Sequence, residues 1–135
     1  CKPLDASVRS FFDILSLSGD NKDMEPQART LLNFTLANGK APFEDWLLTL
    51  GDKTTQARIL RRIDRLRFGQ FGDARNVGAG VFELRVHLGP GYRIYFGLHG
   101  AEVILLLCGG DKSDQSRDIE RAIAYLKDWK QRGKP

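Results

Sequence analysis

Apolar and polar residues alternate along residues 81–86, which is the two-residue period of a strand with one buried face. A Gly-Pro-Gly segment at 89–91 then forces a reversal, after which the chain resumes its apolar character over residues 92–96. A further apolar run covers residues 103–107 and leads into Gly109–Gly110. These segments predict an antiparallel meander that ends in a glycine turn.

The residues before the meander predict one strand and two helices. Residues 30–36 alternate well enough for a strand, and the Asn38–Gly39 pair that follows is a strong turn signal. Helical periodicity begins at Pro42 and places Phe43, Trp46, Leu47 and Leu50 on one face. It returns from about Thr54 to Phe68, and residues 69–80 then read as a glycine-rich connection.

A last helix is predicted after the meander. Ser113 or Asp114 can cap it, and its apolar positions continue through Lys130. Two helices before a meander and one after it indicate an α+β fold. In this fold an antiparallel sheet has the two N-terminal helices packed on one face and is followed by the C-terminal helix.

The length of 135 residues fits one domain with a sizeable core. No run is long and apolar enough for a membrane span, and the start lacks a secretion signal, so we expect no membrane partner and a cytoplasmic protein. Met24 is the single methionine. We therefore expect either that Met24 is the natural start or that residues 1–23 are an added or processed extension, and that residues 24–135 form the functional domain.

Charge and cysteine content limit the kinds of partner and bound group that we expect. The net charge is +4, and because residues 1–42 hold five basic and five acidic groups, residues 43–135 carry the whole excess. A modest positive field suits an anionic partner. Cys1 and Cys108 are far apart, and Cys108 ends the most apolar strand, which favours a buried free thiol over a disulfide. No metal-ligand spacing is present, so we expect neither a metal site nor a cofactor.

A set of motifs gives the chain a family resemblance. They keep a fixed order and together cover about residues 30–130. The motifs are Phe43–Leu47, Arg58–Ile59, Arg62–Leu66, Gly69–Asp73, Glu83–Arg85, Gly89–Phe96 and Leu106–Ser113. In these the chain resembles the RelE/ParE superfamily of type II toxin–antitoxin toxins, and in particular its HigB-like addiction module killer branch.

The resemblance implies an activity and partners. RelE-type toxins cut messenger RNA in the ribosomal A site without a metal, so the implied function is a ribosome-dependent endoribonuclease that inhibits translation. The implied partners are the ribosome, messenger RNA and a cognate antitoxin protein. In the implied reaction a 2′-hydroxyl attacks the adjacent phosphorus, and fixed cations stabilise the charge that develops.

Three cations match the places where such toxins hold charge. Arg93 matches the transition-state arginine of the family, although it could also be a surface arginine in a salt bridge with Glu83. Arg85 belongs to the neighbouring strand, close enough to share one phosphate. Lys112 follows the last strand, where it could contact RNA or simply help to cap the final helix.

The proton-transfer groups have no direct match. Related nucleases often place a tyrosine or histidine in or before the last helix, a region that here reads residues 114–118 without either residue. His87, Asp73 and Tyr92 are possible substitutes. A half-exposed polar role for His87 and turn chemistry for Asp73 are the alternatives.

Basic residues of the second predicted helix are candidate RNA contacts, together with Tyr92. They recur at helical spacing on the face away from the core, and a solvated helix face is the alternative reading. These residues are Arg58, Arg61, Arg62 and Arg65.

Two other functions remain open at this point. A ParE-like gyrase inhibitor shares the fold and does not need the cations. A non-catalytic antitoxin-binding module would explain the missing tyrosine or histidine. Arrest of cell growth by either toxin, and not by the module, separates them.

Overall fold

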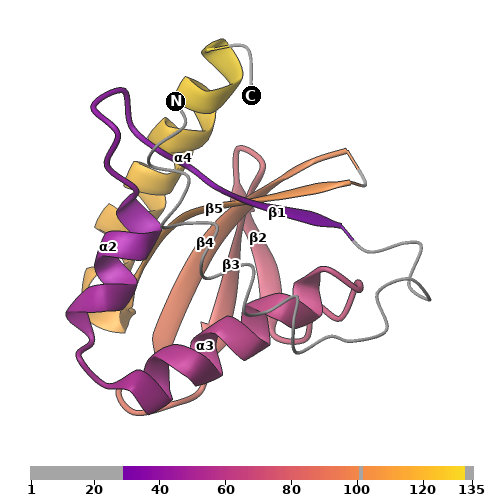
Figure 1. Cartoon of the computed structure of the whole chain (residues 1–135). Coiled ribbons are helices and arrows are strands. Elements are labelled where there is room, and N and C mark those ends of the chain that lie inside the picture. Colours follow the sequence, from indigo (N-terminus) through magenta and orange to yellow (C-terminus); the bar gives the residue numbers. More distant parts are fainter. Residues whose placement is uncertain (1–28, 101, 133–135) are drawn as a thin grey trace.

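The computed structural model describes residues 29–100 and 102–132 (Figure 1). The predicted extension, residues 1–23, lies outside the described residues. Along the chain the helices and strands are β1 (Thr30–Asn33), α2 (Pro42–Thr49), α3 (Lys53–Leu66), β2 (Ala74–Gly78), β3 (Val81–Val86), β4 (Tyr92–His99), β5 (Val103–Asp111) and α4 (Gln115–Gln131). A short 3₁₀ turn, Lys112–Asp114, joins β5 to α4.

The strands form a single sheet in the order β1-β5-β4-β3-β2. The pairs β2–β3, β3–β4 and β4–β5 are antiparallel, which confirms the predicted meander and the predicted α+β class. The first strand differs in direction, because β1 runs parallel to β5. A parallel neighbour requires a long connection, and here α2, α3 and the meander separate the two strands along the chain.

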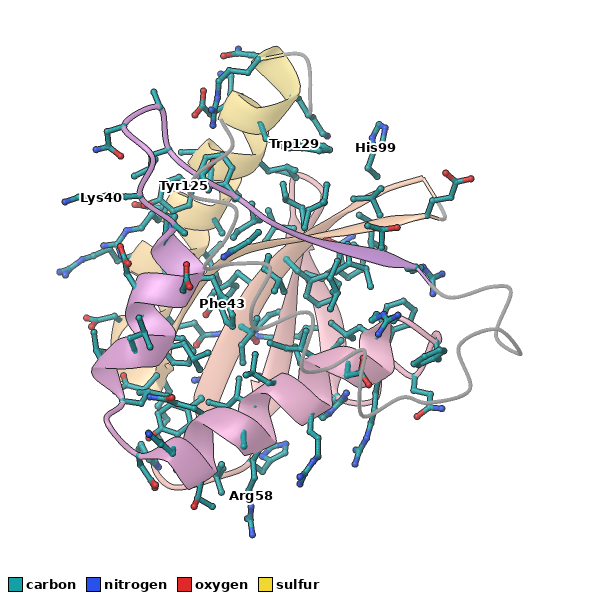
Figure 2. The ribbon with its side chains drawn as sticks, in the orientation of Figure 1. Lys40, Phe43, Arg58, His99, Tyr125 and Trp129 are labelled. Atoms are coloured by element: carbon teal, nitrogen blue, oxygen red, sulfur yellow. The ribbon has the colours of Figure 1, made fainter. Side chains whose placement is uncertain are left out.

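The two N-terminal helices pack on one face of the sheet, as predicted. Phe43 and Leu47 of α2 and Ile59 and Ile63 of α3 are buried in one apolar cluster with the sheet. Figure 2 shows Phe43 pointing from α2 into the interior. The sheet contributes Leu84, Val86, Ile94, Phe96, Ile104 and Leu106 to this cluster.

Helix α4 covers the opposite face. Ala122, Leu126 and Trp129 are buried against a second cluster that contains Tyr95 and Cys108. The ring of Trp129 also meets that of His99 edge-on at 5.5 Å (Figure 2). Cys108 carries a free, buried thiol, as predicted, and burial raises its pKa to about 12.

The segment predicted as a glycine-rich connection contains a strand. Residues 74–78 form β2 at the edge of the sheet, so the prediction of a plain loop over residues 69–80 is wrong there. The strand is mostly exposed and lacks the apolar alternation that identifies a half-buried strand. The strand is formed by its pairing with β3, in which Arg75 lies opposite Glu83.

The prediction of a turn at Gly109–Gly110 is also wrong. Both glycines are buried residues of β5, and they leave room for side chains from two helices. A Cβ at Gly109 would lie 2.4 Å from the ring of Trp46 in α2, and a Cβ at Gly110 would meet the carboxylate of Asp118 in α4. The two glycines are therefore needed because α2 and α4 approach opposite faces of the same strand.

The helix ends follow the predicted chemistry with one change. Pro42 opens α2, and Asp52 caps α3 by accepting bonds from the Thr54 amide and the Thr55 hydroxyl. Asp114 occupies the N-cap position of α4, as one of the two predicted residues, but its side chain makes no capping bond. Asp111 instead caps the preceding 3₁₀ turn, where its carboxylate accepts from the backbone amide and the hydroxyl of Ser113. None of the helices in the described part of the chain is both long and apolar enough to cross a membrane.

Candidate functional site

Several predicted site residues meet at one end of the sheet. Arg85 of β3 lies directly opposite Arg93 of β4, and Arg93 in turn lies opposite Gly110 of β5. On the other side of β3, the amide of Arg85 donates to the carbonyl of Asp73 at 2.9 Å. Asp73, Arg85 and Arg93 therefore belong to one row across three neighbouring segments, although 20 residues separate the first from the last.

The two arginines lie on the face of the sheet that α4 covers in part. Leu84 and Val86 of β3 enter the core beneath α2 and α3, so the alternating residues Glu83 and Arg85 point to the other face. At this end of the sheet α4 begins with Gln115. The arginines thus lie beside the first turn of α4, on a surface that is bordered by polar side chains.

Glu83 is the centre of this surface. Its side chain is fully buried, and five side chains converge on its carboxylate. Oε1 lies 3.2 Å from Nε of Arg75 and 3.4 Å from Nε of Arg85. The other contacts are at Oε2, which accepts from the Gln115 amide at 2.8 Å and the Tyr95 hydroxyl at 3.1 Å and lies 3.5 Å from Nε of Arg93.

This arrangement keeps Glu83 ionised and Tyr95 protonated. Burial by itself would raise the pKa of Glu83, but hydrogen bonds from Gln115, Tyr95 and Arg85 and the charge of Arg75 outweigh it and hold that pKa below its usual value. Burial and the neighbouring Glu83 carboxylate raise the pKa of Tyr95 well above its usual value. Tyr95 is thus a fixed donor within the core.

His87 and Asp73 form a pair beyond Arg85. Nε2 of His87 lies 2.5 Å from Oδ2 of Asp73, and both side chains are largely exposed. The hydrogen bond from His87 lowers the pKa of Asp73, with further contributions from the charges of His87, Arg85 and Arg62. The sequence suggested these two residues separately, 14 positions apart, and the structure brings them together as a histidine oriented by a carboxylate.

Lys112 reaches the same end of the sheet. The residue before it, Asp111, lies opposite Tyr92 at the start of β4, and Lys112 itself is exposed in the 3₁₀ turn. The capping bonds of this turn come from Asp111 and Ser113, and Lys112 contributes none. Among the residues described, no carboxylate forms an ion pair with the Lys112 ammonium group.

Other candidates lie elsewhere. The ring of Tyr92 points to the α2 side of the sheet, where it meets Trp46 edge-on at 5.9 Å, so it does not face Arg85 and Arg93. Arg62 of α3 is half-buried and donates to the carbonyls of Gln70 and Phe71, which fixes the loop before β2.

The remaining arginines of α3 are exposed on the outside of the helix, on the opposite side of the sheet from Glu83. Figure 2 shows Arg58 pointing away from the body of the molecule. These exposed residues are Arg58, Arg61 and Arg65.

The sequence reasoning missed Arg75 and Gln115. Arg75 could not be assigned to the sheet, because its strand has no apolar alternation. Gln115 could not be singled out, because glutamine is common at the start of a helix and indicates no particular contact. The available signal was Glu83 itself, an acidic residue two positions from Arg85 in an otherwise apolar strand. A buried carboxylate requires partners, so its presence predicts convergent donors on the adjacent strands.

Comparisons with known proteins place the chain in a family. Residues 45–127, more than half of the chain, match the family described as Phage derived protein Gp49-like (DUF891). An uncharacterized protein of Haemophilus influenzae is 48% identical to this chain over 80 residues, which cover 59% of this chain and 81% of the relative. The chain therefore belongs to the Gp49-like family of phage-derived proteins, a family associated with RelE-like toxins of toxin–antitoxin systems.

Proposed function

We propose that this protein is a HigB-like toxin of a type II toxin–antitoxin system, which acts in the cytoplasm as a ribosome-dependent endoribonuclease and is neutralised by a cognate antitoxin. Its toxin domain would comprise residues 24–135. Membership of the Gp49-like family supports the toxin assignment. The observation that carries the nuclease proposal is the pairing of Arg85 with Arg93 beside an exposed histidine and lysine at one end of the sheet.

In the proposed reaction the 2′-hydroxyl of one nucleotide attacks the adjacent phosphorus. The O2′–P bond forms, the P–O5′ bond breaks, and the products are a 2′,3′-cyclic phosphate and a free 5′-hydroxyl. A base takes the proton of the 2′-hydroxyl and later returns it to water, and the leaving 5′-oxygen takes one proton from water, so no other reactant is consumed.

Arg93 and Arg85 stabilise the negative charge on the phosphoryl oxygens. A guanidinium group keeps its charge and presents parallel N–H donors that fit two phosphoryl oxygens. Each well-placed donor of this kind contributes on the order of 3 kcal/mol to transition-state stabilisation. The ion pairs with Glu83 hold both groups on the sheet before RNA arrives.

His87 is the proton acceptor in this scheme. Because its Nε2 is bonded to Asp73, Nδ1 is left to accept the proton of the 2′-hydroxyl. Asp73 orients the ring and stabilises the imidazolium that forms. Lys112 lies at the same end of the sheet and stabilises the leaving 5′-oxygen.

The exposed arginines of α3 contribute to binding of the ribosome. Arg58, Arg61 and Arg65 form a row of positive charge on the outside of the helix, away from the proposed reaction centre. Such a row contacts phosphates without reading sequence. Arg62 has a structural part in fixing the loop and is not included in this row.

Expression of the full chain in cells that lack the antitoxin tests the proposal. We expect growth arrest together with new 5′-ends in transcripts, both lost on Arg93→Ala. Arrest without new transcript ends, accompanied by altered plasmid supercoiling, would instead indicate a gyrase inhibitor. Unimpaired growth with the protein present and folded would indicate a non-catalytic antitoxin-binding module.

A further inference from the structure

The three arginines around Glu83 share one mode of contact. Arg75, Arg85 and Arg93 each approach the carboxylate through Nε, at 3.2, 3.4 and 3.5 Å. An arginine that forms a closed two-point ion pair uses its terminal nitrogens as well. Here, among the described residues, no hydrogen bond or ion pair occupies the terminal NH₂ groups of any of the three.

The charges in this cluster do not balance. Three guanidinium groups surround a single carboxylate, and Tyr95 and Gln115 add neutral donors. Among the described residues, Glu83 is the one carboxylate in ion-pair contact with them, and the longer-range charges of Asp73 near Arg85 and of Asp111 near Arg93 offset the remaining positive charge only in part. Repulsion between these guanidinium groups is relieved when singly charged phosphodiester groups bind.

Glu83 prepares the arginines for such a ligand. Hydrogen bonds from Nε restrict the guanidinium planes of Arg75 and Arg85, and Arg93 is held at ion-pair distance without a hydrogen bond at its buried Nε. Within the described part of the chain, the terminal nitrogens of all three are available to a ligand. The carboxylate is itself fully buried and held by Tyr95 and Gln115, so it forms a rigid base. Less freedom has to be lost when the arginines bind a phosphate than would be lost by three independent surface side chains.

The exposure of the arginines rises in one direction. Their side chains are 14% exposed at Arg93, 34% at Arg85 and 56% at Arg75, which lie on β4, β3 and the edge strand β2 respectively. Neighbouring strands are about 4.8 Å apart, so the three backbones span roughly 10 Å. A strand of RNA can thus leave the deep arginine and pass over the edge of the sheet.

We propose that Arg75 is a third RNA-binding residue, and that Arg75, Arg85 and Arg93, organised by Glu83, bind two successive phosphates of single-stranded RNA. This inference rests on the proposed function for its ligand. Arg93 and Arg85 hold the phosphate at the reaction centre. Arg75 holds the neighbouring phosphate toward the β2 edge and takes no part in the chemical step.

The test is equilibrium binding of the full chain to a short single-stranded RNA with 2′-O-methyl groups throughout, which cannot be cut. Fluorescence anisotropy over a salt series gives both the affinity and its salt dependence. For single strands the slope of log K against log salt changes by about 0.7 for each phosphate contact. Lys127→Ala is the matched control, because it removes one exposed positive charge at a position about 18 Å along α4 from Gln115, the helix residue that contacts Glu83.

We expect Arg75→Ala to weaken binding about tenfold at low salt and to reduce the slope by about 0.7. Lys127→Ala should change neither quantity appreciably. Arg75→Lys should keep the slope and recover part of the affinity, because the charge is retained and the contact of Nε with Glu83 is lost. Thermal melts of each variant identify any loss of binding that is caused by unfolding.

The inference is overturned if folded Arg75→Ala binds as tightly as Lys127→Ala with the same slope, or if the unmodified protein does not bind the RNA. Cleavage is measured separately, on messenger RNA with free 2′-hydroxyls that is bound to programmed ribosomes. Binding that depends on Arg75 without any cleavage would leave the inference standing and remove the nuclease proposal. Cleavage by the unmodified protein, together with unchanged RNA binding by Arg75→Ala, would remove the inference and leave the nuclease proposal standing.

Discussion

The side-chain amide of Gln115 donates a 2.8 Å hydrogen bond to the carboxylate of Glu83, so the first residue of α4 is bound to the middle of β3. The same carboxylate holds the arginines of three strands. The position of α4 and the orientation of the arginines therefore depend on one buried group. A change at Glu83 should affect both the stability of the fold and the proposed RNA site.

Replacement of Glu83 by alanine should destabilise the protein strongly. It removes the counter-charge of three guanidinium groups and leaves the Tyr95 hydroxyl without its acceptor. Loss of one partner from a buried ion pair typically costs 3–5 kcal/mol, and we expect about 3 kcal/mol because Arg75 and Arg85 reach solvent. Urea unfolding at pH 7 measures the change. A loss below about 1 kcal/mol would mean that the cluster contributes little to the fold.

The Glu83 carboxylate should also give the stability a characteristic dependence on pH. Its pKa is lower in the folded protein than the ordinary value of 4.5. The associated stabilisation is therefore complete above pH 4.5 and is lost as the pH falls through the lower folded-state pKa. The free energy of unfolding of wild type relative to Glu83→Gln should thus decrease on acidification in this range. A difference that is constant with pH would contradict the assignment.

Gly109 should not tolerate a side chain. An alanine Cβ there would lie 2.4 Å from the indole ring of Trp46, whose position is fixed by Phe43 and Tyr92. We expect Gly109→Ala to cost about 1–3 kcal/mol, the usual range for overpacking a core. Gly97→Ala is the matched control, since its Cβ would meet only the end of the flexible Leu126 side chain at 2.9 Å. Thermal melts should therefore give Gly97→Ala a clearly higher melting temperature than Gly109→Ala. The opposite order of melting temperatures would be inconsistent with this packing.

The pair of His87 and Asp73 should matter for cleavage and not for folding. Both side chains are largely exposed, and His87→Ala should lower the cleavage rate about 10²- to 10⁴-fold, the range for loss of a general base. Asp73→Asn should cost less, since Asp73 acts through the orientation of the ring. His99→Ala is the control, because His99 is an exposed histidine at the other end of β4. Equal rates for the His87 and His99 variants would remove His87 from the mechanism.

Much of the fold could be predicted from local patterns. The meander and the helices are strongly periodic, and their apolar faces enter the core that the periodicity indicates. The pairing of Arg85 with Arg93 also follows, because a tight Gly-Pro-Gly reversal between two strands fixes their register. Sequence reasoning therefore brought the central pair of the candidate site together correctly.

The parts that could not be predicted depend on contacts between distant residues. The strand β2 has no apolar alternation and is recognised only by its pairing with β3. Gly109–Gly110 has the composition of a turn. In the structure these glycines lie within a strand, where they leave space for side chains of the two helices that approach it. The convergence on Glu83 involves four elements, from β2 to α4, and no local pattern contains that information.

Cleavage on the ribosome tests the central claim most directly. The full chain and its Arg93→Ala variant, each shown to be folded, would be added to programmed ribosomes and to naked messenger RNA, and the breaks would be mapped by primer extension. We predict breaks on ribosome-bound messenger RNA only, abolished by Arg93→Ala and retained in Lys127→Ala. Absence of breaks from both samples, or breaks that persist unchanged in Arg93→Ala, would contradict the account.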